Sequence, residues 1–194
     1  MNYPLIYELM GKSAIDSDCG KLCQAACCQR KGPYKKEVEN PNYSQELKEA
    51  GYEEEPEMGM YLFPGEERYA ADVEGFSIEE EMAEDYGFPE SWGEKVYFMT
   101  CMKVECERDK RPIQCRTFPL MPHLTEEGEL RLIHYVGILP YRCPLITESM
   151  PLSEDFIKGV YEGWKLLLQN PGIYDFVWEE SRLRTEEGKI PHEH

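Results

Sequence analysis

The sequence has few basic residues and no long apolar run, and these two shortages exclude whole classes of function. Lys and Arg together number 21 against 38 Asp and Glu, which gives a formal net charge of −17 at pH 7. A chain of this charge repels the phosphates of nucleic acids and the headgroups of anionic membranes. The longest apolar runs, such as residues 136–140, fall far short of the ~20 residues that a membrane-spanning helix needs. We therefore expect no nucleic-acid and no membrane partner.

The motifs of several large enzyme classes are missing as well. The chain contains no GxGxxG, Walker A, HExxH or GxSxG motif, so dinucleotide, P-loop, zincin and serine-hydrolase chemistry have no local support. The two histidines away from the C-terminal tail, His123 and His134, do not support a catalytic role for a cysteine. Residues 1–15 lack the basic region and the cleavage site of a signal peptide, so we expect a cytoplasmic location. That compartment disfavours disulfides and draws attention to the cysteines.

The eight cysteines form two groups that are far apart in the sequence, with one further cysteine after them. Five basic residues and no acid lie between positions 19 and 36. Positive surroundings favour the thiolate, which is the form that binds metals. Since both groups avoid the acidic part of the chain, we expect them to meet at one metal centre. The candidate ligands are Cys19, Cys23, Cys27, Cys28, Cys101, Cys106, Cys115 and Cys143.

The spacing within these groups leaves the identity of the metal open. Three residues separate Cys19 from Cys23 and Cys23 from Cys27, and four separate Cys101 from Cys106. The chain therefore lacks the CxxC pair that is commonest in zinc sites. Four thiolates bind either zinc or an iron-sulfur cluster. The alternatives to metal binding are redox or disulfide chemistry and a set of scattered buried thiols. The sequence selects no disulfide pairing.

Two arginines flank Cys115 and are candidates for a supporting role at the centre. The N–H groups of Arg111 and Arg116 can donate hydrogen bonds to sulfur or to carbonyl oxygens, and such contacts tune a thiolate site from outside the ligand set. The alternative is that these arginines form surface salt bridges with Glu105 or Asp109.

The most distinctive motif of the chain is Arg-Pro-x2-Cys-Arg-x-Phe-Pro at residues 111–119. Together with the cysteines of residues 19–28, the pair Cys101-x4-Cys106 and the final Cys143, it resembles the YkgJ-like family. That family is described as a zinc- or iron-chelating cysteine-cluster domain. The same arrangement of cysteines occurs in flagellin lysine N-methylases, so the resemblance also implies a methyltransferase. It covers residues 19–28 and 101–143.

Hydrophobic patterning and helix-stop residues give a coarse secondary structure. A Gly-Pro pair at residues 32–33 ends a short predicted helix, on which Cys19, Cys23 and Cys27 would share one face. An apolar stripe after Ser153 is typical of a helix that packs on a core. The sequence predicts helices at residues 20–30, 79–85, 153–170 and 174–184, and strands at residues 58–63, 95–99 and 130–136, the last two forming a small antiparallel sheet.

Most of the negative charge lies in one segment. Residues 37–90 contain 18 acids and two bases, a net charge of −16, so the rest of the chain sums to about −1. Few aliphatic residues and several Gly and Pro favour exposed helices and loops over a core. A solvated face is one interpretation of this acidic segment, and a docking surface for a basic protein partner is the other.

The sequence therefore predicts one α+β domain over residues 1–194, small and irregular, with an acidic insertion at about residues 37–90. Short antiparallel strands and several helices would be organised around a cysteine-ligated metal centre. The expected function is that of a cytoplasmic zinc or iron-sulfur protein with a structural or metal-handling role. An enzyme similar to the protein-lysine N-methylases, implied by the resemblance alone, and an acidic interaction module are the alternatives. No catalytic residue is assigned.

Overall fold

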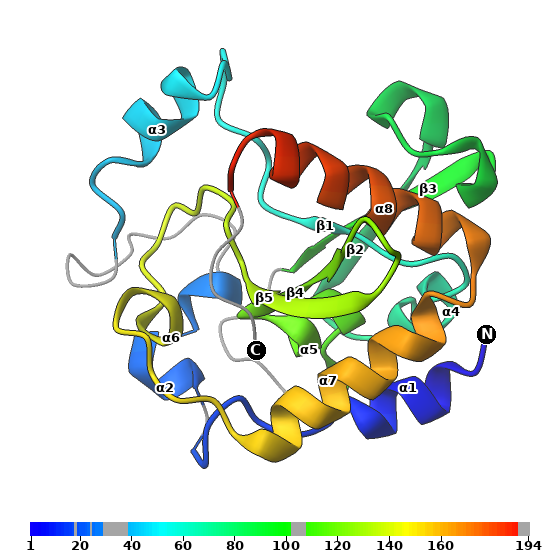
Figure 1. Ribbon diagram of the computed structural model, residues 1–194, viewed down its shortest axis with the longest axis horizontal. Helices are drawn as coiled ribbons and strands as arrows, with labels where there is room; N and C mark the ends of the chain where they lie inside the picture. Colours follow the sequence, from blue (N-terminus) through cyan, green and yellow to red (C-terminus); the bar gives the residue numbers. More distant parts are fainter. Residues whose placement is uncertain (18, 24, 29–38, 102–107, 190–194) are drawn as a thin grey trace.

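Two small antiparallel sheets form the centre of the fold, and helices from both ends of the chain pack around them (Figure 1). The computed structural model describes residues 1–17, 19–23, 25–28, 39–101 and 108–189. In chain order the elements are α1 (Tyr3–Leu9), α2 (Gly20–Cys23), η1 (Ala26–Cys28), α3 (Tyr43–Glu49), β1 (Met60–Tyr61), α4 (Glu67–Ala70), β2 (Phe76–Met82), η2 (Ala83–Tyr86), η3 (Glu90–Trp92), β3 (Lys95–Cys101), η4 (Arg108–Lys110), α5 (Ile113–Thr117), β4 (Leu120–Leu124), β5 (Leu130–His134), α6 (Pro144–Thr147), α7 (Glu154–Leu167) and α8 (Pro171–Glu186).

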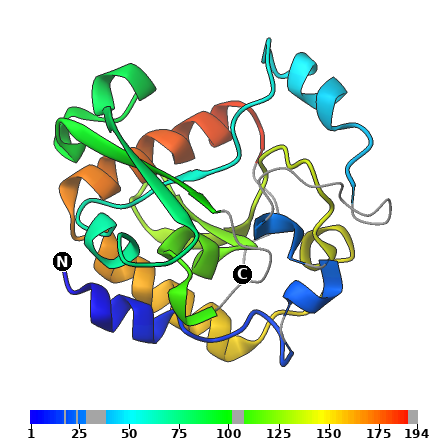
Figure 2. The same cartoon turned by 180° about the vertical axis from the view of Figure 1, so that it is seen from behind.

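The first sheet has the strand order β1-β3-β2, with both neighbours antiparallel to β3. Met60 and Ile78 both pair with Met99, so the central strand is flanked by sulfur and aliphatic side chains on one face. The predicted strands at residues 58–63 and 95–99 are confirmed as β1 and β3. Figure 2 shows this sheet from the side opposite to the view of Figure 1.

The predicted acidic helix at residues 79–85 is wrong. These residues lie mainly in β2, which pairs with β3 over its whole length, and a short 3-10 turn follows. Glu favours helices by a few tenths of a kcal/mol at most, and the hydrogen bonds and side-chain contacts of a sheet outweigh that preference. Gly87 ends the turn, with a left-handed φ of 71°.

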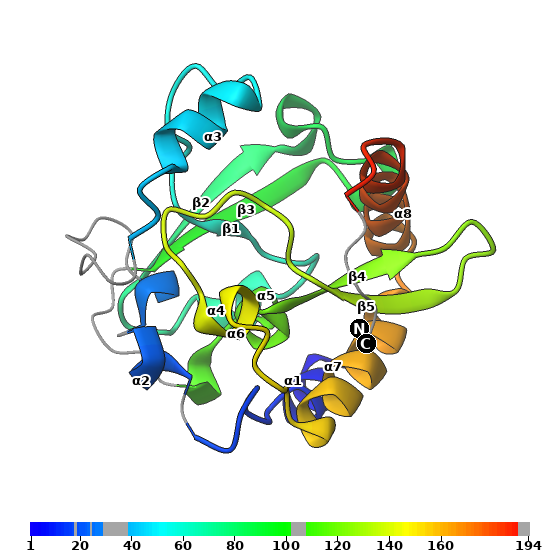
Figure 3. The ribbon, with the colours of Figure 1, turned by 60° about the vertical axis from the view of Figure 1, so that its left-hand side comes forward.

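The second sheet is a hairpin of β4 and β5, separate from the first (Figure 3). The predicted strand at residues 130–136 is confirmed as β5, but its partner is β4, not the strand at residues 95–99. Pro122 lies in the middle of β4, and a proline is tolerated there because a two-stranded sheet consists of edge strands. Two small sheets therefore replace the single one expected.

Helices α7 and α8 pack on the hairpin of β4 and β5 and carry much of the core. The predicted helices at residues 153–170 and 174–184 are confirmed, and Pro171 starts α8 directly after α7. Helix α7 packs against α1 so closely that a Cβ atom on Gly159 would meet the carbonyl oxygen of Leu9. Helix α8 packs against β4 and η3. The buried side chains of α7 and α8 include Phe156, Val160, Trp164, Leu167, Ile173 and Val177.

The fold is thus a small α+β domain with short antiparallel strands and several helices, as the sequence predicts. Residues 37–90 are less uniform than expected, because they contribute two strands of the first sheet as well as helices and loops. Within the described ranges, no helix has the length and apolar character that crossing a membrane requires.

Candidate metal-binding site

The first cysteine group lies on a broken helix. The predicted helix at residues 20–30 is only partly correct: α2 ends at Cys23, Ala25 adopts a left-handed φ of 56°, and η1 begins at Ala26. The amide of Ala25 donates to the carbonyl of Gly20, five residues back, which closes the first turn and stops the α-helix. The chain therefore turns between Cys23 and the next cysteine.

Despite this break, four cysteines line one small cavity of about 20 Å³. Cys19 directly precedes α2 and Cys23 ends it, Cys27 comes from η1, and Cys143 lies 116 positions further along the chain, at the start of α6. Helices α2 and α6 lie side by side in Figures 1 and 2, which brings these segments together. The other lining residues are Gly20, Leu22, Ala25, Arg111, Phe118, Tyr141, Pro144 and Leu145.

Local hydrogen bonds hold Cys143 at this place. Tyr141 forms an isolated antiparallel bridge with Glu39, and Pro144 starts α6 immediately after the cysteine. The amide and the hydroxyl of Thr147 both donate to the carbonyl oxygen of Cys143. The thiol of Cys143 is thus carried by the first turn of a short helix whose backbone is anchored on both sides.

Burial raises the pKa of the two buried thiols, Cys23 and Cys143. The pKa of Cys143 is raised to about 11, mainly by loss of hydration and to a smaller extent by the neighbouring thiols of Cys23 and Cys27. The pKa of Cys23 is also raised, first by burial and then by Cys27 and Cys19. Cys23 thus interacts electrostatically with each of the other three thiols of the cavity. Without a bound cation, Cys143 is protonated at neutral pH.

Cys101 and Cys115 do not line the cavity. Cys101 is the last residue of β3, and Cys115 lies in α5 with its Sγ 3.7 Å from the Sδ of Met60. Cys115 is still near enough to the cavity to raise the pKa of Tyr141, after larger contributions from burial, Cys27 and Cys143. Cys106 and the side chain of Cys28 lie outside the described residues. Of the six candidate ligands whose side chains the structure describes, four therefore line one cavity.

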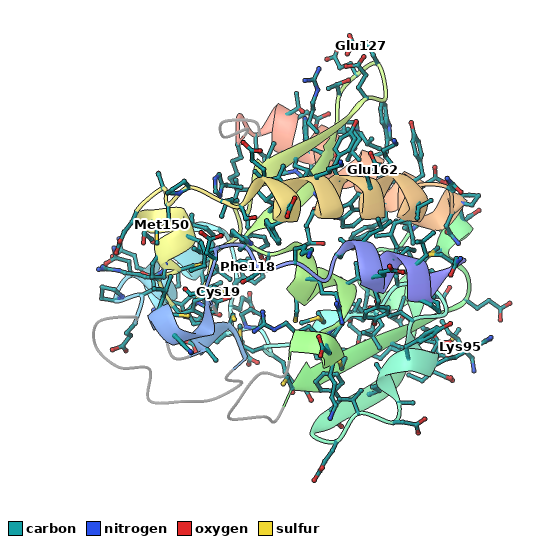
Figure 4. The ribbon with its side chains drawn as sticks, turned by 90° about the horizontal axis from the view of Figure 1, so that it is seen from below. Cys19, Lys95, Phe118, Glu127, Met150 and Glu162 are labelled. Carbon is teal, nitrogen blue, oxygen red and sulfur yellow. The ribbon has the colours of Figure 1, made fainter. Side chains whose placement is uncertain are left out.

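The two arginines occupy different places. Arg111 is buried and lines the cavity next to the thiols, together with Phe118. Arg116 is also buried, and donates to the carbonyl oxygens of Asp109 at 2.7 Å, Arg111 at 2.6 Å and Tyr7 at 3.2 Å. The contact of Arg116 with Asp109 is made to the backbone carbonyl oxygen, and Glu105, the other acid considered as a salt-bridge partner, lies outside the described residues. Figure 4 shows Cys19 and Phe118 near one another, at a distance from Lys95.

Three residues at or near the cavity were not predicted as site residues from the sequence. Glu66 is fully buried although it comes from the acidic segment, and it follows a Pro-Gly turn that predicts exposure. Tyr7 donates its hydroxyl proton to Glu66 at 2.8 Å. Tyr141, two residues before Cys143, closes one side of the cavity. Their roles depend on contacts such as Glu66–Ile113 and Tyr7–Glu66, which join residues 47 and 59 positions apart and which local patterns do not reveal.

No protein-family model, curated protein or solved structure matches the chain. The likeness to the YkgJ-like family therefore stays a prediction from the cysteine motif. In the part of the chain that the structure describes, no group of three or more Cys, His, Asp and Glu side chains is placed to hold a metal ion as it stands. The four thiols share a cavity without converging on one point.

Proposed function

We propose that the chain is a metal-binding protein whose ion is held by the thiolates of Cys19, Cys23, Cys27 and Cys143. The supporting observation is that these four sulfur side chains line one cavity although more than a hundred residues separate the last from the others. Sulfur-only ligation suits zinc, or iron in a cluster, and gives a hard cation such as Mg²⁺ nothing to bind. An ion at this place would connect the N-terminal segment to α6 and act as a structural cross-link.

The size of the cavity favours one ion over a cluster. A volume of about 20 Å³ is slightly more than one water molecule needs, which is ~10–15 Å³. A cluster brings several iron ions together with bridging sulfides and needs more room. A single tetrahedral zinc ion is therefore the better fit to the donors and to the space, and an iron-sulfur cluster is the second candidate.

Binding requires that the thiols rotate toward the ion and lose their protons. Four thiolates and Zn²⁺ carry a net charge of −2, and the guanidinium of Arg111, buried beside them, offsets part of that charge. The metal itself lowers the pKa of a coordinating thiol, so it opposes the rise caused by burial. The turn at Ala25 lies between two of the ligands, where small changes in backbone angles re-aim both side chains.

The test is a metal count on protein purified without oxygen. We expect one zinc per chain, no acid-labile sulfide and no visible colour. Iron with sulfide and absorption near 400 nm would overturn the single-ion proposal in favour of a cluster. Neither metal in the purified protein, and no uptake of zinc on reconstitution, would overturn the metal-binding proposal.

The docking of a basic partner on the acidic segment is a second candidate function. It is favoured by one observation: Glu79 and Glu80 are exposed on β2, which is an edge strand of the first sheet. An extended basic peptide can add to such an edge through backbone hydrogen bonds. The probe is a fluorescent lysine-rich peptide. Binding that weakens when both glutamates are changed to lysine supports docking, and binding that does not weaken contradicts it.

A further inference from the structure

The carboxylate of Glu66 is a fully buried acidic group that the proposed ligand set does not use. Its Oε1 accepts hydrogen bonds from the amide of Ile113 at 2.8 Å and from the hydroxyl of Tyr7 at 2.8 Å. Its Oε2 accepts from the amide of Phe63 at 3.1 Å. One side chain thus joins three segments: α1, the turn before α4, and the first residue of α5.

The contact with Ile113 matters because α5 separates two walls of the thiol cavity. Arg111 lies just before α5 and Phe118 just after it, and both line the cavity. The first amides of a helix have no partner within the helix, so an outside acceptor fixes where the helix begins. A carboxylate is a strong acceptor at this position, because its hydrogen bonds are charge-assisted.

A second set of contacts fixes the same segment from the other side. The guanidinium of Arg116 lies 4.4 Å from the centre of the Tyr7 ring and donates to the carbonyl of Arg111. Tyr7 therefore links the buried anion to the buried cation: its hydroxyl contacts Glu66 and its ring contacts Arg116. Burial raises the pKa of Glu66, and the hydrogen bonds from Ile113, Phe63 and Tyr7 together with the positive charge of Arg116 oppose that rise.

We infer that Glu66 is a positioning residue that holds the segment from Arg111 to Phe118 closed against the thiol cavity. The inference rests on the proposed function in that the cavity is taken as the place where metal binds. Glu66 itself touches no thiol in the described contacts. It acts through the backbone of α5, and its loss is expected to open the cavity to solvent while the rest of the core stays folded.

Glutamine at position 66 tests this, since it has nearly the same shape and only one accepting oxygen. In either orientation its NH₂ group faces at least one of the three donors, so a buried hydrogen bond is lost. In metal-free protein, we expect Glu66→Gln to speed the alkylation of Cys143 by iodoacetamide about tenfold or more, the factor that 1.4 kcal/mol represents. Alkylation at each cysteine is followed by mass spectrometry at one fixed pH.

Val177→Ala is the matched control, because it removes buried volume from α8 and leaves every contact of Glu66 in place. Equal acceleration in Val177→Ala and Glu66→Gln would mean that general loss of stability exposes the thiol, and would overturn the positioning role. Unchanged alkylation in a folded Glu66→Gln protein would overturn it as well. Acceleration only in Glu66→Gln supports it.

Two further measurements keep the test decisive if Glu66→Gln does not fold. In the wild-type protein the amide of Ile113 is expected to exchange with deuterium within about tenfold of the amide of Leu167 in α7. Exchange as fast as in an exposed loop would overturn the inference. Tyr7→Phe removes one donor to Glu66 and leaves both backbone donors, so the amide of Ile113 should stay protected from exchange in this variant. Fast exchange of that amide in Tyr7→Phe would also contradict the role of Glu66.

Cobalt titration of the same samples separates this inference from the metal proposal. If wild-type protein binds no Co²⁺, the metal-binding proposal fails, while the alkylation and exchange rates still decide the role of Glu66. If the wild type binds Co²⁺ and Glu66→Gln binds it about tenfold more weakly with an unchanged thiolate-to-cobalt absorption band, both proposals are supported. A changed band would mean that Glu66 alters the ligand set itself and would contradict a purely positioning role.

Discussion

Replacing Cys143 with serine removes one of the four thiols that line the cavity and changes the size of the side chain very little. Cys115→Ser makes the same chemical change in α5, outside the cavity lining. The motif in the sequence predicts that both cysteines are ligands, whereas the cavity predicts that only Cys143 is. The two variants therefore distinguish the ligand set of eight cysteines from the set of four.

The expected effect follows from linkage between binding and folding. An ion that binds only the folded chain, at a free concentration 1,000 times its Kd, stabilises it by about 4.1 kcal/mol. For a chain of this length, each kcal/mol corresponds to a rise in Tm of about 2–4 °C. Zinc should therefore raise the Tm of the wild type by about 8–16 °C at that concentration, since the folded state alone brings the four thiols together.

The assay is thermal unfolding of each protein with and without zinc, with the free ion set by a chelator buffer. The difference between the zinc-loaded and metal-free Tm values is compared, because either substitution also changes the stability of the metal-free protein. We expect Cys115→Ser to keep the full increment and Cys143→Ser to lose most of it. An undiminished increment in Cys143→Ser would refute the assignment of the cavity as the site. Equal losses in both variants would show that the ligand set extends beyond the cavity.

Three other outcomes are expected. In metal-free protein, burial raises the pKa of Cys143 to about 11. The alkylation rate of Cys143 should therefore increase about tenfold per pH unit above neutrality and level off near pH 11. A rate that levels off near pH 8.5, the pKa of an exposed thiol, would contradict this. Gly159→Ala forces α7 away from α1 and should lower the free energy of unfolding by about 1–3 kcal/mol in urea titrations, whereas Lys158→Ala on the exposed side should change it by less than about 0.5. Thr117→Val leaves the indole N–H of Trp164 without its acceptor at 3.1 Å and should cost about 1–3 kcal/mol; a neutral result would mean that the indole finds another partner.

The long elements could be predicted from sequence, and the short ones could not. Helices α7 and α8 were predictable because their apolar residues recur with helical spacing, and Pro171 marks the boundary between them. The acidic strand β2 was not, because three consecutive glutamates favour a helix locally and only the pairing with β3 makes the segment extended. That pairing joins residues distant in sequence, and local preference contains no information about it.

The candidate site was also predictable only in part. The cysteines were predictable as a group since their residue type and basic surroundings stand out, and four of them do share a cavity. Their spacing was interpreted on a continuous helix, which the left-handed Ala25 interrupts. Glu66 could not be found at all, because nothing distinguishes it from the 17 other acids of residues 37–90 until the fold buries it.

The position of Cys143 in the sequence determines when the proposed site can exist during synthesis. Cys19, Cys23 and Cys27 leave the ribosome before Cys143, which follows Cys27 by 116 positions. At translation rates of about 5–20 residues per second, the three early thiols wait roughly 6–23 s for the fourth. Helix α6 must then dock beside α2 before the cavity is complete. The nascent chain thus passes through a period with three accessible thiols and no finished pocket, and full-affinity loading with metal follows the synthesis of α6.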